Sequence, residues 1–168
     1  PPWREHVAAA DDVVIEIEPG LAFGTGGHQT TQLCLEALET AFMAARPPRR
    51  VLDVGTGSGI LAIGAVLLGA EHALGLDTDA AAIEATHDNA ARNGVSDRVT
   101  ASLVPLADLV RGDAGGTLAA PPFDLVLANI ISGVLRELRT DLIAAVVPGG
   151  RIVLAGILEN EEDAFRAA

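Results

Sequence analysis

Short apolar runs alternate along the chain with segments of helical hydrophobic spacing. Such runs are typical of strands that are buried on both faces of a parallel sheet. The predicted strands of this sheet begin at Val51, His72, Val99, Phe123 and Arg151. Because strands alternate with helices, the pattern predicts an α/β fold with a doubly wound, mainly parallel sheet of strand order 3-2-1-4-5.

The segments between these strands are predicted from their spacing and their turn residues. Val13–Ile17 is predicted as a further short strand, and Pro105–Pro122 as a surface connection. Thr30 or Thr31 is expected to cap the first helix. Helices are predicted after Thr31, after Ile60, and at residues 79–93, 132–147 and 159–168.

The strand that begins at Val51 runs into glycines at three alternate positions, Gly55, Gly57 and Gly59. Glycine has no Cβ, so the chain can turn sharply here and a ligand can rest against main-chain N–H groups at a helix start. Dinucleotide-binding proteins space their glycines differently and would need the third one at Ile60. Taken alone, the turn also fits a plain strand-to-helix connection without a ligand.

Asp77 ends the strand that begins at His72, twenty-two residues after Gly55. In an open α/β sheet this position brings a carboxylate within reach of ribose hydroxyls. The glycine turn and Asp77 together predict a site for an adenosine-containing ligand that has no required pyrophosphate.

Two more segments are predicted to reach the same edge of the sheet. Leu21–Thr31 is a second glycine-rich loop with hydroxyl side chains, and we expect it to close over one end of the ligand. The strand that begins at Phe123 delivers Asn129 to this edge.

Composition and charge restrict the possible classes of protein. The length of 168 residues and the hydrophobic content of 49% fit a globular domain, and we expect a cytoplasmic protein because no apolar stretch is long enough to span a bilayer. The single cysteine, Cys34, excludes an internal disulfide and is expected in the core, and the sequence suggests no metal site. The net charge of −12 argues against nucleic-acid binding. It suits a basic protein or amine substrate, and acidity that serves only solubility is an equally good interpretation.

The glycine-rich segments resemble those of one enzyme family. The glycine turn and Asp77 resemble class I S-adenosylmethionine-dependent methyltransferases. The longer segment Glu18–Thr31 resembles the signature that precedes this turn in bacterial ribosomal protein L11 methyltransferases, the PrmA family. The likeness continues through residues 51–63, 75–79, 88–95, 126–130 and 156–158.

This resemblance implies a Rossmann-like methyltransferase sheet, S-adenosylmethionine as the cofactor, and methylation of lysine or N-terminal amino groups of ribosomal protein L11. Gly55 and Gly57 would admit the cofactor, and Asp77 would bind its ribose hydroxyls. Thr31 would contact its methionine part. Asn129 would also contact the cofactor and, as the catalytic residue, would orient the acceptor amine.

The residues after Asn129 bear on the acceptor. Enzymes that methylate amino groups of nucleic-acid bases carry an aromatic residue here, whereas Ile130, Ile131 and Ser132 follow in this chain. A flexible alkyl amine is therefore favoured over adenine or cytosine. The alternatives are methylation of another protein or a small amine, aminopropyl transfer, and a cofactor-binding module without catalysis.

The resemblance also predicts how the chain is divided. Residues 1–12 are expected to be a linker from an upstream substrate-recognition domain, and residues 13–168 the S-adenosylmethionine-binding domain. Because the family fold has two more strands than the sequence shows, the domain is expected to be truncated at its C-terminal end.

Overall fold

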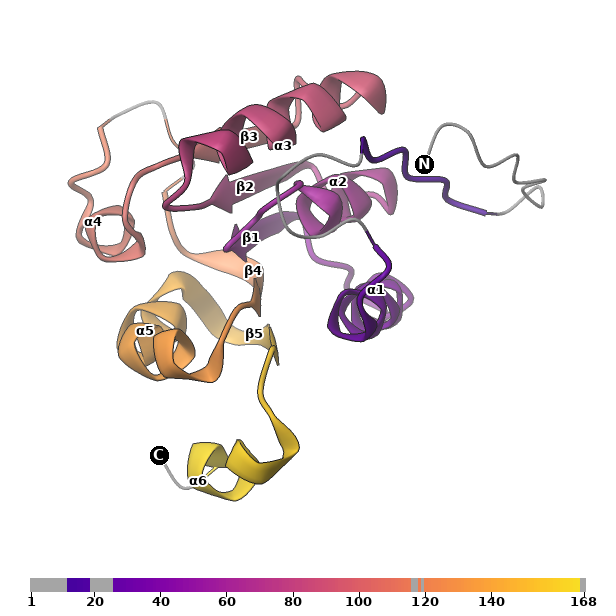
Figure 1. The fold of residues 1–168 in the computed structure, drawn as a ribbon. Helices are drawn as coiled ribbons and strands as arrows, with labels where there is room; N and C mark the ends of the chain where they lie inside the picture. Colours follow the sequence, from indigo (N-terminus) through magenta and orange to yellow (C-terminus); the bar gives the residue numbers. More distant parts are fainter. Residues whose placement is uncertain (1–11, 19–25, 116–117, 119, 167–168) are drawn as a thin grey trace.

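The computed structural model describes residues 12–18, 26–115, 118 and 120–166. Its strands form one five-stranded parallel sheet of order β3-β2-β1-β4-β5, as the sequence predicts (Figure 1). The strands are Arg50–Val54 (β1), His72–Leu76 (β2), Val99–Ser102 (β3), Phe123–Asn129 (β4) and Val146–Ala155 (β5). The predicted doubly wound α/β fold is confirmed.

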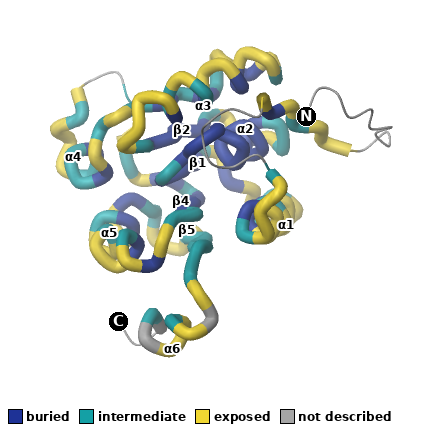
Figure 2. The backbone as a smooth tube through the Cα atoms, in the orientation of Figure 1, coloured by how far each residue is buried: buried dark blue, intermediate teal, exposed yellow. Residues whose placement is uncertain are grey.

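Helices cover both faces of the sheet. One face carries Gln29–Phe42 (α1), Ile60–Leu67 (α2) and Ala80–Arg92 (α3), and the other carries Leu106–Arg111 (α4) and Ser132–Ala145 (α5). After β5 come a short 3-10 turn, Glu159–Glu161 (η1), and Glu162–Arg166 (α6). Burial is most complete along the central strands and along α2, which packs between α1 and α3 on its face of the sheet (Figure 2). None of the helices in the described ranges has the length and apolar character that a membrane span requires.

The register of the sheet aligns three strand ends. Val54 at the end of β1 pairs with Leu76 of β2 on one side and with Ala128 of β4 on the other. The strands are parallel, so the residues that follow them meet at one carboxyl edge, which is where open α/β sheets bind ligands. Gly55, Asp77 and Asn129 all lie at this edge.

The prediction of a strand at Val13–Ile17 is wrong. This segment is irregular, and the described part of it pairs with side chains instead of a neighbouring strand. The N–H groups of Glu16 and Glu18 donate to the side-chain oxygens of Asn93 and Asn89, at 2.9 and 3.0 Å. Side-chain amides of α3 thus satisfy backbone groups that a strand would pair in a ladder.

The connection after β3 contains a helix that the sequence analysis did not predict. Leu106 and Leu109 of α4 are buried with α5 against the sheet. Their spacing of three residues places both side chains on one helix face, which is the hydrophobic pattern that indicates a helix.

Two element boundaries also differ from the prediction. The side chain of His28, and not that of Thr30 or Thr31, caps α1 by accepting a hydrogen bond from Thr30 N at 3.3 Å. β5 begins before Arg151, because residues 148–150 form an irregularity within the strand instead of ending it.

Candidate active site

The glycine turn, residues 55–59, connects β1 to α2 at the carboxyl edge. Gly55, Gly57 and Gly59 have φ angles of 75°, 55° and 80°. This left-handed region strains any residue that carries a Cβ. The backbone itself therefore requires glycine at the three positions, and the predicted sharp turn is present.

The main-chain N–H groups of this turn have partners within the protein. Gly55 and Thr56 both donate to the Leu76 carbonyl at the end of β2, at 2.8 and 3.0 Å. Gly59 donates to Thr56 O at 2.8 Å. The turn thus closes on the end of β2, and the assignment of Gly55 to the cofactor site stays a prediction.

Asp77 lies directly against the glycine turn. Its Oδ2 accepts a hydrogen bond from Gly57 N at 3.0 Å, and its Oδ1 accepts one from Asp79 N at 3.1 Å. Asp77 is half-buried, and both of its carboxylate oxygens accept backbone hydrogen bonds. The structure thus brings together Gly57 and Asp77, two of the residues predicted to bind a nucleoside, although they are twenty residues apart in sequence.

Thr31 and Asn129 form a second contact between predicted site residues. The Asn129 side-chain amide donates to the Thr31 hydroxyl at 3.4 Å across 98 residues of sequence. Thr31 is buried in the first turn of α1, and Asn129 is half-buried at the end of β4. The two polar groups face each other at the same edge as the glycine turn. Residues 19–25 of the preceding glycine-rich loop lie outside the described part of the chain.

Ile130, which follows Asn129 directly, packs against the glycine turn. The sequence analysis gave it no such role. A Cβ on Gly55 would lie 2.2 Å from Ile130 Cγ2, and a Cβ on Gly156 would lie 2.3 Å from the Ile130 carbonyl oxygen. Two glycines from different strand ends thus hold the residue after Asn129 between them. The hydrophobic pattern gave no signal for this, because Ile130 reads as one more apolar residue at the end of β4.

We expect Gly55→Ala to lower the free energy of unfolding by about 2 to 3 kcal/mol, since it adds backbone strain to a clash with Ile130. Chemical denaturation measures this. Gly112→Ala is the matched control, because Gly112 has a similar φ of 82° and no atom within 4 Å of the added Cβ. Equal losses in the two variants would show that Ile130 yields without cost.

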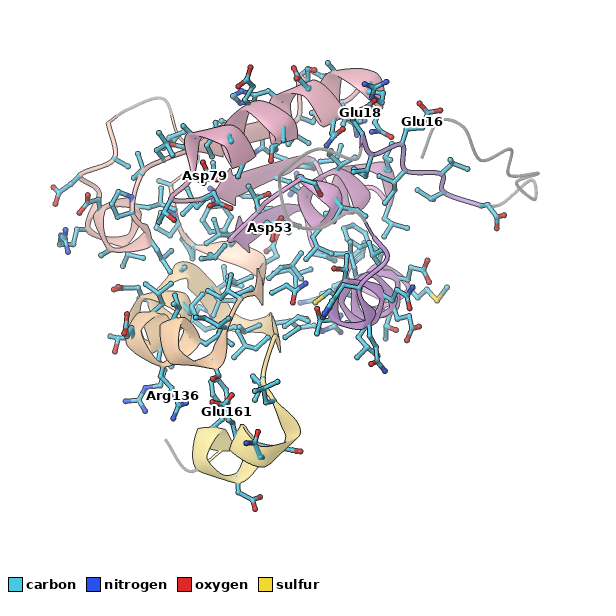
Figure 3. The ribbon with its side chains drawn as sticks, viewed as in Figure 1. Glu16, Glu18, Asp53, Asp79, Arg136 and Glu161 are labelled. Atoms are coloured by element: carbon cyan, nitrogen blue, oxygen red, sulfur yellow. The ribbon has the colours of Figure 1, made fainter. Side chains whose placement is uncertain are left out.

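The loop after Asn129 is also held from the C-terminal side. The Ser132 hydroxyl donates to Glu161 Oε2 at 2.7 Å, and Arg136 of α5 lies 3.6 Å from the other oxygen of that carboxylate. The hydrogen bond from Ser132 lowers the pKa of Glu161. Figure 3 shows Arg136 and Glu161 close together between α5 and α6.

Asp53 is a buried carboxyl beneath the glycine turn that the sequence analysis did not single out. Its side chain accepts a hydrogen bond from the Thr56 hydroxyl at 2.8 Å. Burial, with a smaller contribution from the charge of Asp77, raises the pKa of Asp53 to about 7. An acid within the apolar run of residues 51–54 was the signal that could have identified it.

Cys34 is buried in α1, as predicted. Burial and the nearby Asp53 raise the pKa of its thiol to about 11, so it is a core residue and not a reactive thiolate. Among the residues that the structure describes, no three His, Cys, Asp or Glu side chains are grouped as metal ligands.

This architecture defines the class of Rossmann-like methyltransferases. A family model described as ribosomal protein L11 methyltransferase (PrmA) matches residues 1–168. The chain belongs to this family, as the resemblance predicted.

Individual relatives agree with this assignment. A ribosomal protein L11 methyltransferase from Geotalea daltonii is 44% identical over 171 residues, which is 97% of this chain and 51% of the relative. The chain therefore spans about half the length of the curated relatives it matches.

Solved structures extend the comparison to three dimensions. The ribosomal protein L11 methylase from Lactobacillus delbrueckii subsp. bulgaricus superimposes with a TM-score of 0.82 at 34% identity, covering 99% of this chain and 79% of that one. A methyltransferase from Geobacter sulfurreducens, solved in complex with S-adenosyl-L-homocysteine, has a TM-score of 0.55 at 25% identity and covers 76% of this chain and 51% of that one.

Proposed function

We propose that this protein transfers methyl groups from S-adenosylmethionine to amino groups of ribosomal protein L11. The observation that carries the proposal is the meeting of two residue pairs at one carboxyl edge, Gly57 with Asp77 and Thr31 with Asn129. Membership of the methyltransferase family and the S-adenosyl-L-homocysteine in the Geobacter sulfurreducens structure support the same cofactor.

The residues at this edge suit such a cofactor. Asp77 is a half-buried residue with a carboxylate, the kind of acceptor that binds two ribose hydroxyls. Gly55 and Gly57 form the tight left-handed turn that would admit the nucleoside beside Asp77, and the Thr31 hydroxyl would bind the methionine part. Asn129 stands between the cofactor and the acceptor.

When bound, S-adenosylmethionine supplies an electrophilic methyl group, so the protein needs no nucleophilic side chain. Its residues must align the acceptor nitrogen and keep that amine neutral. A lysine with a pKa near 10.4 costs about 4.6 kcal/mol to deprotonate at pH 7, and desolvation in a closed site lowers this cost. We assign the orientation of the amine to Asn129, through its side-chain or backbone carbonyl.

The surroundings of Asn129 favour a flexible amine on a basic protein. Ile130 and Ile131 follow it, and neither can stack on a base as an aromatic ring does. The net charge of −12 attracts a basic ribosomal protein and disfavours direct contact with nucleic acid. Such a substrate places the activity in the cytoplasm.

Transfer of a tritiated methyl group from S-adenosylmethionine to purified ribosomal protein L11 tests the proposal. We expect the label on lysine or N-terminal amino groups of that protein. An aminopropyltransferase would not move the labelled methyl group, and a module without catalysis would bind the cofactor and transfer nothing. Label on another protein or a small amine, with none on ribosomal protein L11, would contradict the proposed substrate.

Replacement of Asp77 by alanine is expected to weaken cofactor binding by about 1.5 to 3 kcal/mol, because it removes a charged acceptor from two hydroxyls. Calorimetric titration with S-adenosylhomocysteine measures the change. Asp79→Ala is the matched control: it removes a neighbouring acid that caps α3 through Ala81 N at 2.9 Å, and it should cost stability and little affinity. Unchanged affinity in folded Asp77→Ala would mean that the cofactor binds elsewhere.

We also propose that residues outside 13–168 recruit the protein substrate, because the residues assigned to cofactor and amine all lie between Thr31 and Asn129. This chain should then methylate ribosomal protein L11 about 100-fold less efficiently than the longer Geotalea daltonii relative, since a docking domain raises the local concentration of the acceptor. Comparing kcat/KM at matched cofactor saturation tests this. Equal efficiencies would place the recognition surface within residues 13–168.

A further inference from the structure

Three polar side chains on one face of α3 bind the backbone of other segments. They are Thr86 and Asn89 within α3 and Asn93 at its C-cap, spaced three and four residues apart, and we call them the polar face of α3. Thr86 and Asn89 are buried, with 0% and 1% of their surface exposed. Asparagine and threonine are weak helix formers, so their place within a helix calls for a tertiary reason.

The first part of this face holds the glycine turn. The Thr86 hydroxyl donates to Gly57 O at 3.1 Å, and the Asn89 side-chain amide donates to Ser58 O at 2.9 Å. A Cβ on Gly59 would lie 2.8 Å from the Thr86 methyl carbon, so α3 also packs closely on the turn. Two consecutive carbonyls of the turn are thereby fixed toward α3. On the other side of the turn, Asp77 accepts a hydrogen bond from Gly57 N at 3.0 Å. The backbone around Gly57 is therefore held both by α3 and by Asp77.

The second part of the face holds residues 16–18. Asn89 Oδ1 accepts from Glu18 N at 3.0 Å, so one amide bonds to the glycine turn and to this segment at once. Asn93 accepts from Glu16 N at 2.9 Å and donates to Glu16 O at 2.7 Å. Arg92 adds an ion pair with Glu18 at 2.9 Å. Figure 3 shows Glu16 and Glu18 beside the C-terminal end of α3.

We propose that Asn89 is a positioning residue for cofactor binding. By bonding to both backbones, it holds the glycine turn in the conformation that leaves room for the nucleoside, and it links residues 16–18 to that conformation. Asn93 bonds to Glu16 and also donates to Asn89 O at 2.8 Å, and Thr86 bonds to the turn. This inference rests on the proposed S-adenosylmethionine site.

The three side chains allow a matched set of variants. Asn89→Asp keeps the acceptor for Glu18 N but replaces the donor to Ser58 O with a carboxylate oxygen. Thr86→Val removes the bond to Gly57 O and keeps the methyl group against Gly59. Asn93→Ala removes both bonds to Glu16 and the bond to Asn89 O, and leaves those of the turn in place. Thermal unfolding identifies which variants are folded, and Thr86→Val serves if Asn89→Asp is not.

Calorimetric titration with S-adenosylhomocysteine is the first readout. We expect at least tenfold weaker binding in Asn89→Asp, about fivefold weaker binding in Thr86→Val, and a change within threefold in Asn93→Ala. Wild-type affinity in folded Asn89→Asp, or an equal loss in Asn93→Ala, would overturn the inference. Failure of the unsubstituted protein to bind S-adenosylhomocysteine would instead overturn the proposed function on which the inference rests.

Hydrogen exchange of the ligand-free protein is the second readout, and it does not depend on activity. Asn89→Asp and Thr86→Val should speed exchange of the amides in residues 55–59 and leave residues 13–18 unchanged, whereas Asn93→Ala should do the reverse. Unchanged exchange of residues 55–59 in both of the turn variants would show that the turn keeps its conformation without these bonds, which would also overturn the inference.

Discussion

Replacing Asn129 by alanine is expected to lower kcat by about three orders of magnitude while cofactor affinity changes little. The side-chain amide lies at the end of β4 and donates to the Thr31 hydroxyl at 3.4 Å, at the edge where we propose that cofactor and acceptor meet. Orientation of the amine matters chiefly in the transition state, and its loss therefore appears in the rate and not in the binding of the cofactor.

Single-turnover rates and calorimetric affinities must be measured separately in this variant. Ser132→Ala is the control. Ser132 follows Asn129 by three residues, and its hydroxyl donates to Glu161 at 2.7 Å, so we assign it no part in orienting the acceptor amine. We expect the control to keep most of its turnover. If Asn129→Ala loses as much cofactor affinity as rate, the residue binds the cofactor and does not orient the amine.

The second large effect is on stability, and it comes from Asp53. Its pKa is about 7 in the folded protein and near 3.8 when unperturbed. Between these values the unfolded chain releases the proton and the folded protein keeps it, so rising pH favours unfolding. The full cost is reached above pH 7 and amounts to roughly 4 kcal/mol, at about 1.36 kcal/mol per pH unit. Below pH 4 the cost is absent.

Asp53→Asn keeps the shape of the side chain and removes this titration. Denaturant unfolding of both proteins from pH 4 to pH 8 should show the variant gaining stability relative to the unsubstituted protein as pH rises. Asp97→Asn controls for the loss of one carboxylate, since the Asp97 side chain is 80% exposed. If the difference in unfolding free energy between the unsubstituted protein and Asp53→Asn stays constant from pH 4 to pH 8, the Asp53 carboxyl is already ionised at pH 4 in the folded protein.

The sequence was sufficient for the parts of the fold that depend on local pattern. The apolar runs at β1, β2 and β4 and the glycine turn all lie where the hydrophobic spacing predicts them. The predicted strand at residues 13–17 was wrong because the backbone of residues 16–18 bonds to Asn89 and Asn93, more than seventy residues away, and no local pattern reveals these partners. α4 was missed although Leu106 and Leu109 have helical spacing, because the glycines and prolines around them indicated a loop.

The candidate site divides in the same way. Gly55, Asp77 and Asn129 could be placed at one edge from the sequence, since each follows a parallel strand. The contact of Thr31 with Asn129 depends on how α1 packs, which spacing alone does not give. Asn89 had a signal that was overlooked, because a buried face of α3 that carries Thr and Asn must bond to another segment.

The most direct test of the account is a structure of the protein with S-adenosylhomocysteine bound. We expect both ribose hydroxyls within about 3 Å of the Asp77 carboxylate and the sulfur atom beside Thr31 and Asn129. The glycine turn should keep its bonds to Thr86 and Asn89. Ligand bound elsewhere on the folded protein, with Asp77 still bonded only to Gly57 and Asp79, would contradict the assignment of this edge as the methyltransferase site.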